Sequence, residues 1–185
     1  MTEKLISFDL ENDTIMSLQC LLDALSQIES GNSSYFKWAV VYGHNSAQSV
    51  MCLALITSDS HLVRKKNSCH SEYGDLDNIE WLYEKLRIKD FLPYMDSQVI
   101  DSQRFEKVKM SRLQAVRNSF IHQQPSSYVF TFNELLELIR ISVDLVGFLI
   151  NESGRLALND HTESQIKDLV DKLRTQLTRY NGVNS

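Results

Sequence analysis

The sequence predicts an all-α protein, an up-and-down bundle of about five to six helices that forms a single domain over residues 1–185. Glycine and proline are scarce, with six and two residues, which disfavours a turn-dense β protein. Apolar residues recur at spacings of three and four in several segments, whereas no segment alternates like a half-buried strand. A hydrophobic content of 43% suffices for a sizeable core, and we expect only residues 1–9 and 181–185 to fray.

Two helices are predicted in the first third of the chain. Asp13 or Thr14 can cap the first, which ends near Ser30 and Gly31. Its apolar stripe consists of Ile15, Leu18, Leu22, Leu25 and Ile28. The second, over residues 35–56, is apolar nearly all round, as expected for the central helix of a bundle.

A polar segment without periodicity, residues 57–74, predicts a long loop. Asp77 and Glu80 then have the spacing of a capping box ahead of a short helix that ends near Leu86. Pro93 closes the connection that follows this helix.

A fourth, long helix is predicted from about Asp101 to Gln123, and Pro125 stops it. Its expected core stripe consists of Phe105, Val108, Leu113, Val116 and Phe120. Two apolar helices follow, and capping boxes formed by Thr131 with Glu134 and by Thr162 with Gln165 should begin them. Residues 151–160 form either an ordinary connection or a hinge before a loosely attached last helix.

Charge and cysteine content exclude several classes of protein. A net charge of -5 is not that of a protein that coats nucleic acid. The three cysteines form no CxxC pair, which indicates a reducing cytoplasm rather than disulfides. The acidic first residues argue against a secretory signal, and no apolar stretch predicts a membrane span. Since His61, Cys69 and His70 lack the spacing of a tetrahedral site, we expect no metal.

The residues with the clearest chemical potential are Arg117, Asn118 and His122, which form the pattern R-N-x-x-x-H at the end of the fourth helix. Asn118 and His122 lie one turn apart on one face, which Gln114 shares, whereas Arg117 lies about 140° round from His122. Convergence of the arginine and the histidine therefore requires the long Arg117 side chain to curl round, or a twofold partner to bring a second set of residues.

This motif, followed by a capped apolar helix, resembles the Rx4-6H signature of the HEPN superfamily. The resemblance implies an HEPN-like bundle and a metal-independent endoribonuclease that cleaves single-stranded RNA in the cleft of a homodimer. It also implies catalytic roles for His122 as general acid and base, Arg117 as phosphate binder and Asn118 as the residue that orients His122 or binds substrate. A setting in toxin–antitoxin or anti-phage defence, with an antitoxin or other regulatory protein as partner, would follow.

Four further residues are candidates for substrate binding: Lys109, Arg112, His44 and Gln48. The first two lie in a locally basic helix, which attracts phosphate or is simply a solvated face. His44 and Gln48 interrupt an apolar helix, so they are either hydrogen-bonded within the core or line a cleft, and contact with the His122 helix would favour the cleft.

The alternative to catalysis is a non-catalytic HEPN-like module that binds a nucleotide or a protein, because many members of the superfamily are not enzymes. In that case Arg117 and His122 are polar residues at a helix end, with Arg117 paired to an acid such as Asp144.

Overall fold

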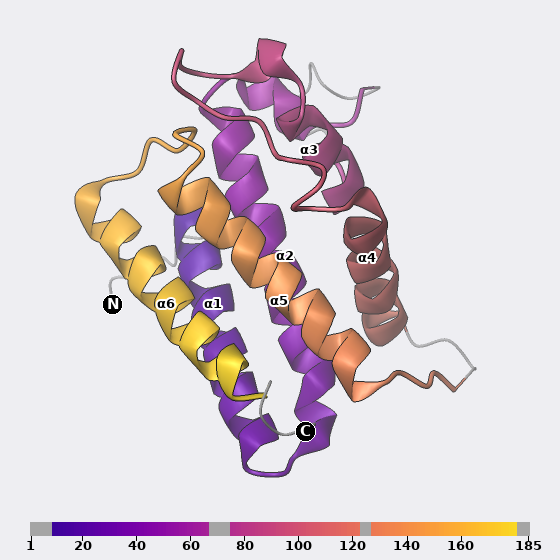
Figure 1. Ribbon diagram of the computed structural model, residues 1–185. Coiled ribbons are helices and arrows are strands. Elements are labelled where there is room, and N and C mark those ends of the chain that lie inside the picture. The colour runs from indigo at the N-terminus through magenta and orange to yellow at the C-terminus, as the bar shows by residue number, and fades with distance from the viewer. Residues whose placement is uncertain (1–8, 67–74, 123–126, 181–185) are drawn as a thin grey trace, which may run out of the picture.

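The computed structural model describes residues 9–66, 75–122 and 127–180, and within these ranges the protein is an all-α bundle of six helices (Figure 1). The helices are α1 (Leu10–Glu29), α2 (Phe36–Ile56), α3 (Ile79–Leu86), α4 (Lys107–Ile121), α5 (Phe132–Asn151) and α6 (Asp160–Arg179). Three short 3-10 turns, at Ser33–Tyr35, Ser60–Val63 and Lys89–Phe91, join them. The predicted fold class is confirmed. The ends expected to fray lie outside the described residues, except Asp9.

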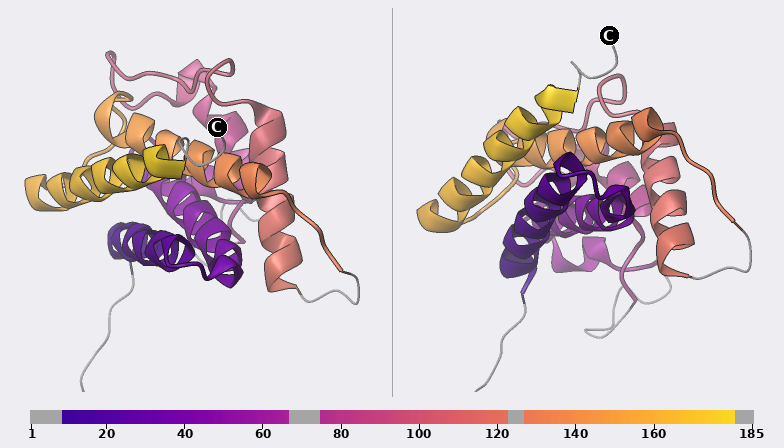
Figure 2. Two further views of the ribbon diagram at one scale, coloured as in Figure 1. Left: turned by 60° about the horizontal axis from the view of Figure 1, so that its bottom comes forward. Right: turned by 90° about the horizontal axis from the view of Figure 1, so that it is seen from below.

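Helix α2 is the centre of the bundle. It packs against α1, α3, α4 and α5, and most of its residues are buried, as its all-round apolar character predicted. Helices α1 and α6 pack on each other beside it, while α3 and α4 lie on its other side (Figures 1 and 2). None of the helices described combines the length and apolarity needed to cross a bilayer.

The start of α1 is shifted from its predicted position, whereas that of α5 is not. Asp9, rather than Asp13 or Thr14, caps α1, because its carboxylate accepts the backbone N–H of Asn12 at 2.8 Å. The start of α5 is as predicted, since the Thr131 hydroxyl accepts the N–H of Glu134.

Asparagines replace the other two predicted caps. Asn78 caps α3, while the neighbouring Asp77 instead forms an ion pair with Lys85. Asn159 caps α6 by accepting the N–H of Thr162, so Thr162 lies inside the helix rather than at its start.

Helix α4 is shorter than predicted and buries a different stripe. The chain around Asp101 forms turns, so the helix begins only at Lys107, after Phe105. Met110, Leu113 and Val116 form its buried face, whereas Val108, two positions before Met110 and therefore on the opposite side, is 76% exposed. Pro125, the expected stop, lies outside the described residues.

The last helix is firmly packed, which contradicts the hinge alternative. Its apolar face, which includes Ile166, Val170 and Leu173, is buried against α1 and α5. The connection before it is fixed by Arg155, whose buried guanidinium donates to the carbonyls of Leu86 and Phe91 at 2.9 and 2.5 Å. The segment between α5 and α6 is therefore held against the end of α3.

Candidate functional site

The R-N-x-x-x-H motif occupies the last turns of α4, as the sequence predicted, and His122 is the C-cap residue. The backbone N–H of His122 donates to the carbonyl of Asn118 at 2.9 Å. The imidazole is exposed, and within the described ranges it makes no side-chain hydrogen bond or ion pair. It is therefore accessible to a molecule that approaches the end of α4.

Arg117 curls round the helix toward Asn118. Its Nη1 donates to Asn118 Oδ1 at 3.1 Å. The side chain therefore bends round the helix surface toward the face that carries Asn118. The alternative partner, Asp144, pairs instead with Arg174 on α6. Among the described residues Arg117 forms no ion pair, and its Nε is buried without a hydrogen-bond partner. A half-buried cation is thus held by a neutral amide.

Asn118 Oδ1 accepts a second hydrogen bond, which links Arg117 to the core. Gln114, one turn earlier on α4, donates through Nε2 to the same Asn118 Oδ1 at 3.0 Å. No described bond joins the Asn118 side chain to the His122 ring, so Asn118 contacts the arginine of the motif rather than its histidine.

His44 lies beneath this cluster on α2 and is only 1% exposed. Its Nε2 lies 3.0 Å from Gln114 Oε1, while its Nδ1 has no hydrogen-bond partner. Burial lowers the pKa of His44 below its ordinary value, and the nearby charge of Arg117 acts in the same direction, although the hydrogen bond to Gln114 opposes them. The contact with the His122 helix that would favour a cleft exists, yet the ring is buried, so His44 supports α4 from within the core.

The other candidate substrate-binding residues lie apart from this cluster. Gln48 donates to the backbone carbonyl of Asp77, near the start of α3. Lys109 pairs with Glu106 and Glu137, and Arg112 pairs with Glu134 at 2.5 Å. Arg104 and Lys107 are likewise paired with glutamates. Of the five Lys and Arg residues between Asp101 and His122, Arg117 alone lacks an acidic partner among the described residues.

Aromatic residues within the motif and just after it form a ladder that the sequence did not predict. Phe120 packs edge-on against Phe130 with 5.3 Å between centroids, and Tyr128 stacks on Phe130 at 6.2 Å. Tyr128 is 40% exposed. The only sequence feature that pointed to this ladder was the closeness of these aromatic residues to His122.

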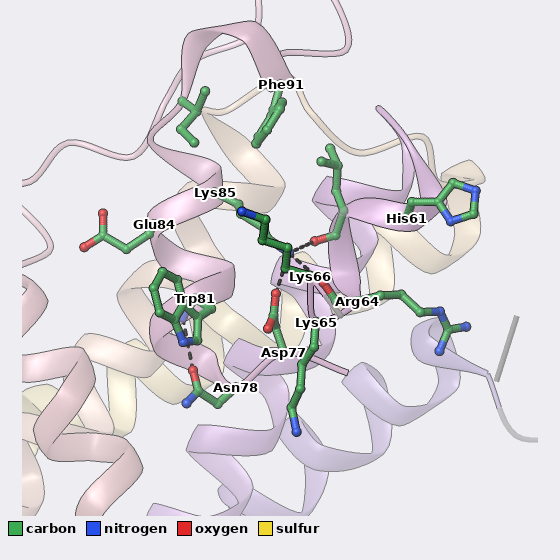
Figure 3. Close-up of a pocket in the computed structure, with 12 residues that line it drawn as sticks. His61, Arg64, Lys65, Lys66, Asp77, Asn78, Trp81, Glu84, Lys85 and Phe91 are labelled. Carbon is green, nitrogen blue, oxygen red and sulfur yellow. Dashed lines mark hydrogen bonds and ion pairs between the residues drawn. The ribbon is translucent and has the colours of Figure 1, made fainter. Parts of the chain in front are cut away.

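A hollow of about 740 Å³ lies elsewhere, between the 3-10 turn at Ser60–Val63 and α3 (Figure 3). Trp81 and Phe91 contribute aromatic surface, and Arg64, Lys65 and Lys66 bring positive charge to it. Lys85 crosses the site: its ammonium donates to the carbonyls of Leu62 and Arg64 and to the Asp77 carboxylate. None of the predicted site residues lines this hollow.

The described residues contain no group of three or more His, Cys, Asp or Glu side chains arranged to hold a metal. His61 lines the hollow of Figure 3, whereas Cys69 and His70 lie outside the described residues.

Comparison of the chain with protein-family models, curated proteins and solved structures gives no significant match. The resemblance to the HEPN superfamily therefore rests on the motif and on its place at the end of a helix in an all-α bundle.

Proposed function

We propose that the protein is a metal-independent endoribonuclease of HEPN type that cleaves single-stranded RNA in a homodimer. The observation that carries the proposal is the contrast within α4: its other cations are paired, while Arg117 has no acidic partner among the described residues and lies five positions before an exposed His122. A cation without a counter-charge at the same helix end as an accessible imidazole suits the binding and cleavage of a phosphodiester.

The reaction needs proton transfer and charge stabilisation rather than a protein nucleophile. His122 of one protomer accepts the proton of the RNA 2′-hydroxyl, whose oxygen attacks the adjacent phosphorus. The protonated His122 of the second protomer donates to the departing 5′-oxygen. Arg117 binds the phosphate oxygens as negative charge develops on them. The products are a 2′,3′-cyclic phosphate and a 5′-hydroxyl.

The test is cleavage of single-stranded RNA in the presence of EDTA by wild type, His122→Ala and Arg117→Ala. We expect each substitution to lower the cleavage rate by on the order of 10² to 10⁴, because each removes a distinct element of transition-state stabilisation. His161→Ala, which removes an exposed histidine on α6, is the matched control and should cleave like wild type. Equal cleavage by wild type and His122→Ala would contradict the proposal.

The setting that follows is cytoplasmic toxin–antitoxin or anti-phage defence, with a regulatory protein that restrains the nuclease. Genes next to the coding sequence and proteins that co-purify with the chain would test it. Complete absence of an inhibitory partner in both would argue against a toxin.

A second candidate function is a non-catalytic module that binds a nucleotide or a protein. The hollow of Figure 3 favours it, since aromatic and basic residues line it and no residue of the motif does. Intact RNA after incubation with wild-type protein, together with saturable nucleotide binding that Trp81→Ala abolishes, would support this function over the first.

A further inference from the structure

We propose that His44 positions Arg117 through a relay of two side-chain amides, Gln114 and Asn118. The inference rests on the proposed function, because it assigns a role to a buried residue that cannot itself touch RNA. His44 lies on α2 and the other three residues lie on α4, so the relay connects the central helix of the bundle to the phosphate-binding group.

The polarity of the relay follows from the chemistry of arginine. A guanidinium can only donate hydrogen bonds, so the atom of Asn118 that faces Arg117 at 3.1 Å must be its carbonyl oxygen. The atom of Gln114 that lies 3.0 Å from the same oxygen must then be its NH₂ group. The Gln114 carbonyl consequently faces His44, and His44 must donate to it through Nε2–H.

Each member thus fixes the next. Without the donor on His44, the Gln114 amide could turn over and present its oxygen to Asn118, and two carbonyl oxygens would then face each other. Asn118 would rotate away, and Arg117 Nη1 would lose its described hydrogen-bond acceptor. Because His44 is 1% exposed, water cannot easily replace its N–H.

The environment of His44 keeps this donor in place. Burial lowers its pKa, so the ring is neutral near pH 7 and adds no positive charge next to Arg117. The Nδ1 atom has no hydrogen-bond partner, which leaves Nε2 as the nitrogen whose proton is used. His44 is therefore a positioning residue that acts through Gln114, rather than a catalytic one.

The test compares His44→Phe, which keeps a ring but removes the donor, with His44→Gln, whose terminal NH₂ can reach the position of Nε2. We expect His44→Phe to lower kcat by on the order of 10-fold with little change in KM, because the arginine is misplaced rather than removed. His44→Gln should recover most of the loss. Gln114→Leu breaks the relay outside the core helix and should reproduce the effect of His44→Phe.

Nuclear magnetic resonance provides readouts that do not depend on cleavage. Long-range ¹H–¹⁵N correlation should show the Nε2–H tautomer of His44, and the side-chain ¹⁵N signals of Arg117 should broaden or shift in His44→Phe. Gln176→Met, which removes a buried amide on α6, is the matched control and should leave both signals unchanged.

The two proposals fail in different ways. If wild type leaves RNA intact, the nuclease proposal fails, but the side-chain ¹⁵N signals of Arg117 still test the relay. The relay is overturned if His44 carries its proton on Nδ1, if the Arg117 signals do not respond to His44→Phe, or if His44→Gln is as impaired as His44→Phe.

Discussion

Two histidines of this chain show how position decides the role of one side chain. His44 is buried on the central helix and bonded to an amide, whereas His122 is exposed at the end of α4 with its ring unbonded to any described residue. The first can hold a neighbour in place, and only the second can meet a substrate. Histidine thus has a supporting position in the core and an accessible position at the surface of the same site.

The lowered pKa of His44 predicts how stability changes with pH. In the unfolded chain the residue titrates near its ordinary value of about 6.5, so below that pH the unfolded state binds the proton first. The stabilisation is present above about pH 6.5 and is lost as the pH falls toward the lower folded pKa. Urea midpoints measured between about pH 7.5 and 5.5 should therefore fall for wild type, and fall less for His44→Gln. Parallel pH profiles for the two proteins would contradict this assignment.

At the scale of single residues, the motif was predictable from the sequence but its supporting contacts were not. Helical geometry indicated that Arg117 and His122 converge only if the arginine curls round or a twofold partner supplies a second set. Arg117 curls as far as Asn118, and no described contact joins it to His122. The link through Gln114 to His44 joins positions 70 residues apart, so no local periodicity could reveal it. The available hint was a histidine in the middle of an otherwise apolar helix.

Among the helices, the starts of α3 and α6 show that a local capping pattern does not by itself decide which residue caps a helix. Asp77 and Thr162 satisfied the capping pattern, yet Asn78 and Asn159 cap α3 and α6. An aspartate and an asparagine side by side have similar capping propensity, and here the ion pair with Lys85 engages Asp77. At α3, a contact outside the capping pattern therefore chose between candidates that the local sequence leaves equivalent.

The cap of α6 gives a direct test at this scale. Replacing Asn159 by alanine removes the acceptor for the N–H of Thr162, and we expect the free energy of unfolding to fall by about 1 kcal/mol. Chemical denaturation followed by circular dichroism measures the change. Ser164→Ala, at an exposed position of the same helix, should alter stability by less than about 0.5 kcal/mol. A larger loss for Ser164→Ala than for Asn159→Ala would refute the assignment of the cap.

Over the whole molecule, the sequence predicted the all-α class and the central place of α2 because both depend on apolar periodicity and overall composition. It misplaced the start of α4, since Phe105 continues the apolar spacing although the chain there forms turns. It also left open whether α6 follows an ordinary connection or a hinge, because the hydrogen bonds of Arg155 depend on carbonyls far away in the chain.

The distribution of charge predicts how RNA binding should respond to salt. The chain is acidic overall, and Lys109 and Arg112 on α4 are already paired with glutamates, so a dimer offers about two Arg117 cations to the backbone. For single strands this corresponds to a slope of roughly -1.4 in a plot of log Kobs against log salt. Binding of a 2′-deoxy analogue, which cannot be cleaved, measures it. A slope steeper than about -4 would mean that the paired lysines and arginines also bind phosphate.

The bridge between Arg64 and Leu76 joins the end of the Ser60–Val63 turn to the chain that leads into α3. Backbone bonds from Lys65 to Asp75 and from Asp77 to Val63 hold these two parts of the chain side by side. Because Lys65 and Asp75 are held by backbone bonds of their own, an insertion between them should leave α2 and α3 in place. This position is therefore a natural place to graft a tag or a reporter peptide.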